Sequence, residues 1–147
     1  MIALIQRVSH AEVSVAGKTV ASIGAGMLAL VGVRPEDDES SARRLLVRLL
    51  RYRIFEDKEG KMNLSLPQVG GHLLLVPQFT LAADTRHGLR PGFSTAAAPD
   101  LGRRLFEGLL LAAQAQHSHV QSGRFGANMQ VSLTNNGPAT FWLQTGP

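Results

Sequence analysis

Hydrophobic and polar residues alternate with a helical period in two stretches of the chain. From about Asp38 to Arg51, apolar residues recur three and four positions apart, which is the spacing of one buried helix face. The acids from Glu36 to Glu39 stand where that helix would begin, and the helix dipole favours negative charge there. A second stretch, from about Pro99 to Gln116, opens with a proline and an aspartate and carries a stripe of leucines. The pattern predicts two amphipathic helices.

The rest of the chain favours short β-strands. Alternation is clear in Glu12–Val15, and Gly17 with its neighbours predicts a hairpin turn. The strand-like segments are Ile2–Val8, Glu12–Ala16, Lys18–Ile23, Met27–Val33, His72–Val76, Met129–Leu133 and Ala139–Gln144. Many short strands with two helices predict an α+β fold, in which the helices pack on one side of a curved, antiparallel-rich sheet or small β-barrel.

One of these segments, His72–Val76, is continuously apolar, as a buried central strand would be. It runs directly into Pro77-Gln78-Phe79-Thr80. Proline cannot donate to a strand ladder, so regular pairing should stop there. Such a place suits either a functional site or the start of a loop.

Length and composition bound the class of protein. The 147 residues, 44% of them apolar and 18% charged, predict one globular domain over residues 1–147. No apolar run reaches the ~20 residues of a membrane span, and the first residues lack a signal-peptide pattern. We therefore expect a cytoplasmic protein with no membrane partner. Cysteine is absent, which excludes disulfides, a thiolate nucleophile and cysteine-ligated metal.

The charge comes mainly from arginine. The net charge is +4, and 12 of the 15 basic residues are Arg. Guanidinium groups suit phosphate, so an RNA or nucleotide partner is one interpretation, and compositional drift is the other. Arg44, Arg48 and Arg51 would form a stripe on the first helix that either contacts a phosphate backbone or is simply solvated.

Few other residues offer familiar chemistry. His117 and His119 could form a metal pair if extended, but no carboxylate stands beside them, and a solvated loop is favoured. The charged segment Asp84–Arg90 is either a phosphate clamp or a wet turn. Glycine loops of the Walker and dinucleotide types are missing, which argues against kinases, NTPases and dehydrogenases.

A last pattern lies near the end of the chain, at Thr134–Thr140. Its Asn136-Gly137 pair stands between two strand-like segments, and spacing alone predicts a hairpin turn there. Pro138 fixes one backbone angle and raises the frequency of a cis peptide bond. The Gly–Pro unit would also present two carbonyl groups with little side-chain cover.

Two motifs together resemble a known family. The segment Gln78-Phe79-Thr80-Leu81-Ala82-Ala83-Asp84, combined with Asn135-Asn136-Gly137-Pro138-Ala139-Thr140, is similar to the signature motifs of the bacterial and eukaryotic-type D-aminoacyl-tRNA deacylases. The resemblance covers essentially the whole chain in the expected order. Its further segments are Met1–Val8, Tyr52-Arg53-Ile54-Phe55, Gly60-Lys61-Met62-Asn63, Gly123-Arg124-Phe125 and Met129-Gln130-Val131.

The resemblance implies a homodimeric α+β protein with its active site at the subunit interface. It implies hydrolysis of the ester that joins a D-amino acid, or glycine, to the terminal adenosine of tRNA. It also implies that neither a metal nor an organic cofactor is needed, and no DNA partner is expected. The competing interpretations are an RNA-binding module without catalysis and an esterase with a threonine nucleophile.

Site residues follow from the same resemblance. It implies that Gly137-Pro138 is a cis dipeptide that enters the partner subunit's pocket and that Arg7 helps to hold it. The residues expected to line the pocket for the aminoacyl group are Gln78, Phe79 and Thr80, and those expected beside the adenine are Phe125 and Met129. The chain departs from the family pattern at Pro77, where serine is usual, and at Ala139, where valine is common.

These residues suggest a mechanism that needs little from side chains. An aminoacyl ester is already activated, and the neighbouring ribose hydroxyl can assist attack by water. The protein would position the ester and stabilise the oxyanion with backbone N–H groups near Phe79 and Thr80. Only three of the 11 acids lie beyond residue 60, so we expect no obligatory general base. Rejection of L-amino acids would be steric.

Overall fold

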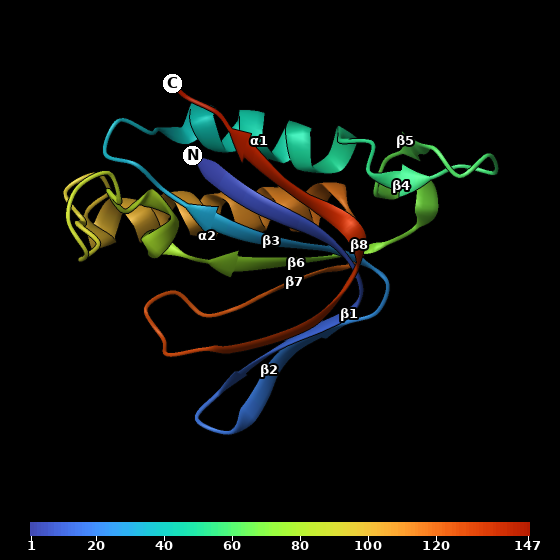
Figure 1. Ribbon diagram of the computed structural model, residues 1–147, viewed down its shortest axis with the longest axis horizontal. Helices are drawn as coiled ribbons and strands as arrows, with labels where there is room; N and C mark the ends of the chain where they lie inside the picture. Colours follow the sequence, from blue (N-terminus) through green and yellow to red (C-terminus); the bar gives the residue numbers. More distant parts are fainter.

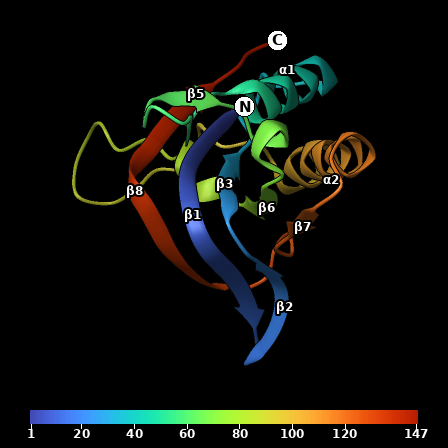
Figure 2. The same ribbon diagram turned by 90° about the vertical axis from the view of Figure 1, so that its right-hand side faces the viewer.

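Two helices cover one face of a strongly curved sheet in the computed structural model, which describes residues 1–147 (Figures 1 and 2). The helices α1 (Glu39–Arg51) and α2 (Pro99–Gln116) confirm both predicted helices. α1 begins with a capping box: the Asp38 carboxylate accepts a hydrogen bond from the Ser41 N–H at 3.0 Å, and the Ser41 hydroxyl accepts one from the Asp38 N–H. Neither α1 nor α2 combines the length and the hydrophobicity of a membrane-spanning helix.

The main sheet is mixed and nearly closes on itself, which confirms the α+β prediction. Its strands run in the order β2-β1-β3-β6-β7, and β8 pairs with β1 on the other side. The contacts of β1 with β2, β3 and β8 are antiparallel, whereas β6 is parallel to both of its neighbours. The strands are β1 (Ile2–Val15), β2 (Lys18–Ile23), β3 (Gly26–Gly32), β6 (His72–Pro77), β7 (Val120–Ser122) and β8 (Gln130–Gln144).

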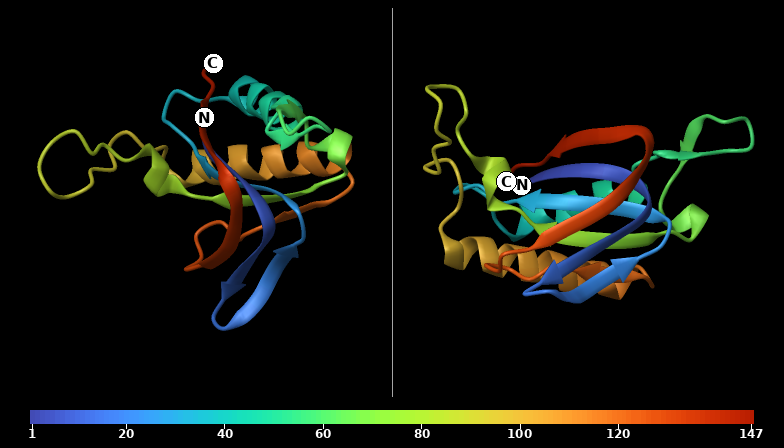
Figure 3. Two further views of the ribbon diagram at one scale, coloured as in Figure 1. Left: turned by 45° about the vertical axis from the view of Figure 1, so that its right-hand side comes forward. Right: turned by 60° about the horizontal axis from the view of Figure 1, so that its bottom comes forward.

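Smaller elements complete the chain. A two-stranded sheet joins β4 (Phe55–Glu56) to β5 (Met62–Leu64), and two 3-10 turns are η1 (Pro67–Val69) and η2 (Phe79–Ala82). A long loop between η2 and α2 projects from one end of the molecule (Figure 3). The sequence pattern did not predict these short elements, because two or three paired residues carry no readable period.

Two pairs of predicted segments are single long strands. Ile2–Val8 and Glu12–Ala16 merge into β1, and Met129–Leu133 and Ala139–Gln144 merge into β8. The exposed residues between the first pair stay extended because β8 pairs alongside them. The predicted hairpin after β1 is confirmed, since Ala16 and Gly17 both have positive φ, as a type I′ turn requires.

The apolar residues form two clusters, one on each face of the curved sheet. The larger, of 22 buried residues, joins the leucine stripes of both helices to β1, β3 and β6. The smaller, of eight residues, is enclosed where β1, β2, β3 and β6 curl over. The consecutive residues Leu73–Val76 are all buried, which confirms β6 as a central strand. Pairing ends at Pro77, as predicted.

The arginine stripe of α1 has a structural role that neither interpretation of the sequence anticipated. Arg44 donates to the carbonyl of Gly146, and Arg48 donates to the carbonyl of Gln144 at 3.1 Å. These two side chains tie the C-terminal segment to the helix. Two of the stripe's guanidinium groups are therefore already engaged within the chain.

Candidate functional site

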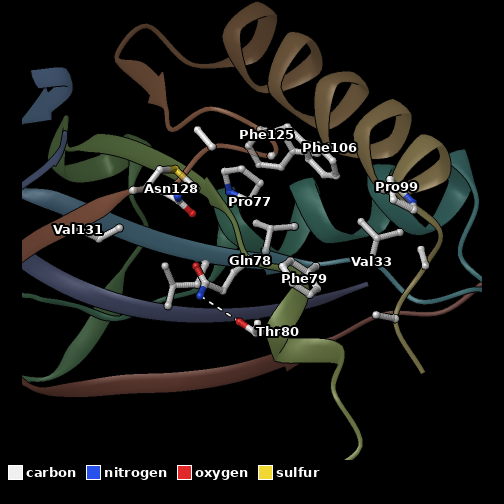
Figure 4. A pocket seen from close by; sticks show the side chains of 18 of the residues that line it. Val33, Pro77, Gln78, Phe79, Thr80, Pro99, Phe106, Phe125, Asn128 and Val131 are labelled. Carbon is white, nitrogen blue, oxygen red and sulfur yellow. Dashed lines mark hydrogen bonds between the residues drawn. The ribbon is translucent and has the colours of Figure 1, made fainter. Parts of the chain in front are cut away.

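A cavity of about 960 Å³ opens beside the end of β6, between the sheet and the start of α2 (Figure 4). Its lining comes from β3, β6, η2, α2, the loop before α2, the segment that leads into β8 and the start of β8 itself. We call this cavity the pocket. Fifteen of its 22 lining residues are hydrophobic, and its polar side chains are those of Gln78, Thr80 and Asn128.

One wall of the pocket is the turn that follows β6. Gln78 is the first residue beyond the strand, and its N–H still donates to the Val31 carbonyl at 2.7 Å. Its side-chain amide donates to the Thr80 hydroxyl at 3.1 Å (dashed in Figure 4). The chain then enters η2, and the first N–H groups of such a turn, here those of Phe79 and Thr80, have no partner inside it.

Phe125 and Met129 form the opposite wall. Each of these side chains packs closely against a glycine. A Cβ atom added to Gly102 on α2 would lie 3.2 Å from the Phe125 ring, so the ring packs directly against the helix. A Cβ atom added to Gly123 would lie 2.7 Å from the Met129 sulfur. Glycine at these two positions therefore lets both side chains reach the pocket.

None of the 22 lining residues carries an ionisable side chain. The Gln78 amide donates to Thr80 and cannot remove its proton, so the threonine has no general base within hydrogen-bond reach. The lining likewise offers no carboxylate, imidazole or thiolate ligand for a metal ion, and no group of three such residues occurs in the chain. The pocket can bind an apolar or aromatic group and orient it with a few amide and hydroxyl contacts.

The Asn136-Gly137 pair does not form the hairpin turn that its spacing predicts. β8 continues through it, because Val8 pairs with Asn135 and Gln6 pairs with Thr140, so that Asn136–Ala139 stand opposite the single residue Arg7. We call Asn136–Ala139 the bulge. Gly137 and Pro138 are exposed at its tip, and the bond between them is cis.

Hydrogen bonds from two side chains hold the bulge. Arg7 is 6% exposed, and it donates from Nε to the Asn136 carbonyl and from Nη1 to the Ile54 carbonyl, both at 2.8 Å. Asn135 donates across the base of the bulge to the carbonyls of Arg7 and Ala139, at 3.0 and 3.1 Å. The bulge therefore replaces the turn because the arginine and the amide satisfy the carbonyl groups that strand pairing leaves free.

The structure divides the predicted site residues into two groups. The pocket brings together Gln78, Phe79, Thr80, Phe125 and Met129. The remaining three lie at the bulge and line no part of the pocket in the same chain: Gly137 and Pro138 form its tip, and Arg7 on β1 supports it.

Several lining residues were not predicted from the sequence. Phe93, Asn128 and Phe106 come from segments with no recognisable motif, and Phe93 lies 5.3 Å from Phe79 between ring centroids. Gly102 did carry a signal, because glycine in a helix interior is costly and often marks a close approach.

The other candidate sites are occupied by contacts within the chain. Arg86 is paired with Asp84 at 2.8 Å, and this hydrogen-bonded guanidinium lowers the pKa of the Asp84 carboxyl. The side chain of His117 is buried, with Nε2 2.7 Å from the Gly71 carbonyl, and the ring of His119 lies against His72 at 4.6 Å. His117 and His119 therefore do not form a metal pair.

Comparison with known proteins identifies the family of this chain. A model of the D-Tyr-tRNA(Tyr) deacylase family matches residues 4–144. This chain belongs to that family. A relative from Azotobacter vinelandii named D-aminoacyl-tRNA deacylase is 62% identical over 144 residues, covering 98% of this chain and 99% of the relative. One of the same name from Thioalkalivibrio sulfidiphilus is 60% identical over 147 residues, covering 100% and 99%.

Solved structures share the fold. The c-Myc DNA unwinding element binding protein superposes with a TM-score of 0.95 at 31% identity, with full coverage of both chains. A probable eukaryotic D-amino acid tRNA deacylase superposes with a TM-score of 0.83 over 97% of each chain, at 20% identity, and this match concerns the fold alone. The family assignment makes the chain an enzyme of the deacylase class, a hydrolase.

Proposed function

We propose that this chain hydrolyses the ester of D-aminoacyl-tRNA, and of glycyl-tRNA, with the pocket as the site of the aminoacyl-adenosine end. Family membership supports the reaction class. The observation that carries the mechanism is the absence of any ionisable side chain from the pocket lining. Such a pocket suits an already activated ester, for which orientation and oxyanion stabilisation supply the catalysis.

In the proposed reaction a water oxygen attacks the ester carbonyl and the negative charge moves to the carbonyl oxygen. The free N–H groups of Phe79 and Thr80 at the start of η2 are suited to receive that oxyanion. The bond from the carbonyl carbon to the ribose oxygen then breaks, and that oxygen takes up the proton released by the water. The neighbouring ribose hydroxyl assists the transfer, so the products are a free amino acid and tRNA with its terminal hydroxyl restored.

Selection for D-amino acids would come from the bulge of a second copy of the chain. The exposed Gly137-Pro138 tip lines no part of its own pocket, which supports its entry into a partner's. The carbonyl groups of Gly137 and Pro138, at the tip of a bulge that Arg7 and Asn135 hold, would bracket the substrate ammonium group and Cα hydrogen. An L side chain would collide with this backbone, a D side chain would point to solvent, and glycine would pass.

Deacylation assays test this proposal with three substrates at catalytic enzyme concentration: D-tyrosyl-tRNA, L-tyrosyl-tRNA and glycyl-tRNA. We expect release of amino acid from the first and third, and none above the spontaneous rate from the second. Tight binding of all three without turnover would support an RNA-binding module instead. Efficient hydrolysis of L-tyrosyl-tRNA would contradict the steric filter.

The assembly is tested separately by light scattering or sedimentation. The proposal expects a dimer at the concentrations used in the assay. Full activity of a monomer would refute the contribution of a partner's bulge. It would leave the reaction itself in place.

A further inference from the structure

Arg103, on the exposed face of α2, lies against the outer side of the pocket wall. Its guanidinium carbon is 4.9 Å from the centre of the Phe125 ring, in a cation–π arrangement. Its Nη2 atom is 3.6 Å from where a Cβ atom on Gly126 would stand. Phe125 and Gly126 both line the pocket, so the guanidinium group lies at its rim.

The charge of Arg103 is largely free. Its one acidic partner is Glu107, at 3.6 Å, and the two side chains are 53% and 56% exposed. Exposed pairs at this distance hold a cation weakly. Arg124 precedes Phe125 in sequence, is exposed and forms no ion pair within the chain. Arg103 therefore places a weakly paired cation beside the aromatic wall of a pocket that contains none, and a second exposed cation, Arg124, adjoins Phe125 in sequence.

The next residue, Arg104, is also an arginine on α2, but its side chain points toward α1 and away from the pocket. It pairs with Glu39 of α1 and lines the groove between the two helices. Arg104 is absent from the pocket lining, and the cation–π partner of Phe125 is Arg103. The pair Arg103 and Arg104 thus provides an internal control for the effect of position.

We propose that Arg103 binds the phosphodiester on the 5′ side of the terminal adenosine. The inference rests on the proposed function, which places the adenosine end in the pocket, and on the expectation from the family resemblance that the adenine lies beside Phe125. The 5′ oxygen of that nucleoside carries a phosphate, and an uncharged pocket has no group to receive it. The phosphate would therefore lie at the rim of the pocket, where the planar N–H donors of the Arg103 guanidinium group suit its oxygens.

The test compares three substrates that share the D-tyrosyl ester: 3′-O-D-tyrosyl-adenosine, its 5′-monophosphate, and D-tyrosyl-tRNA. For Arg103→Gln we expect kcat/KM to fall about 10-fold on the two phosphate-bearing substrates, which corresponds to losing one charge-assisted hydrogen bond. On the adenosine ester we expect no change. The salt dependence of kcat/KM for tRNA should also become shallower by about one phosphate contact.

Arg104→Gln is the matched control and should leave all three rates unchanged. An equal loss on all three substrates in Arg103→Gln would overturn the proposal, since Arg103 would then only support the Phe125 ring. A loss on tRNA alone would place the phosphate elsewhere and would also overturn it, as would no loss at all. A wild-type chain inactive on all three substrates would instead refute the proposed function itself.

Discussion

The pocket and the bulge contain the two sequence motifs, and they are built in opposite ways. The pocket is apolar, and the structure records one hydrogen bond between its side chains, that from Gln78 to Thr80. The bulge is polar and exposed at its tip, and Arg7 and Asn135 make three hydrogen bonds to its carbonyls and its base. In this chain the polar side chains of Arg7 and Asn135 fix the backbone of the bulge. The pocket has no ionisable side chain, so in the proposed reaction its shape orients the substrate, and water and the substrate's own ribose hydroxyl supply the reacting groups.

The largest effect should come from breaking the support of the bulge. Arg7→Met removes the donors to Asn136 and Ile54, and each carbonyl left unpaired costs about 1–3 kcal/mol of unfolding free energy. A displaced bulge should reduce hydrolysis of D-tyrosyl-tRNA about 100-fold, the scale expected for misplacement by ~1 Å. Urea unfolding and deacylation assays measure the two effects. Wild-type activity in this variant would show that the bulge does not depend on Arg7.

A smaller change at the same place concerns the amide that closes the base of the bulge. Asn135→Asp replaces a donor by an acceptor facing the carbonyls of Arg7 and Ala139. We expect the free energy of unfolding to fall by about 1–3 kcal/mol. The preference for D- over L-tyrosyl-tRNA should fall with it. If stability falls while the preference stays intact, the rigidity of the bulge is not what discriminates.

On the pocket side, stability and activity should move in opposite directions. Gly102→Ala strengthens α2 by up to about 1 kcal/mol, because alanine is the better helix former. The added methyl group meets the Phe125 ring at 3.2 Å and should shift it, lowering kcat/KM several-fold. Gly108→Ala is the control, since a Cβ atom there meets nothing within 4 Å, and it should raise the unfolding midpoint without changing kcat/KM.

The smallest effect should come from the hydroxyl of the pocket. Thr80→Val keeps the shape and removes only the acceptor for Gln78. Without a base beside it the hydroxyl is not activated, so we expect turnover to fall by less than about 10-fold. Complete loss of turnover, together with an acyl-enzyme detected by mass spectrometry in the wild type, would favour a threonine nucleophile.

Helices and the central strand were predictable because they have long or strongly apolar patterns. Both helices, the hairpin at Gly17 and the end of β6 at Pro77 are where the sequence predicted them. The long strands β1 and β8 were predicted only in pieces. The exposed middle of β1 is held by pairing with β8, and that of β8 is held by this pairing and by the hydrogen bonds of the bulge. Contacts between distant segments leave no local period.

The site was predictable through its two motifs and not through its walls. Asn136-Gly137 has the composition of a turn, and the hydrogen bonds of Asn135 and of Arg7, which is distant in sequence, hold it as a bulge instead. Phe93 and Asn128 enter the pocket because the loop before α2 and the segment after β7 fold over it. Such placement follows from tertiary packing, which composition and spacing do not encode.

Because the pocket lining is uncharged, shifted pKa values do not mark the proposed active site of this enzyme. Perturbed acids commonly point to active sites, but here they mark turns and caps. The Ser40 hydroxyl and the Ser41 N–H lower the pKa of Asp38 to about 2 at the start of α1, and Asp38 lies outside the pocket. A survey for unusual titration would therefore overlook the cavity.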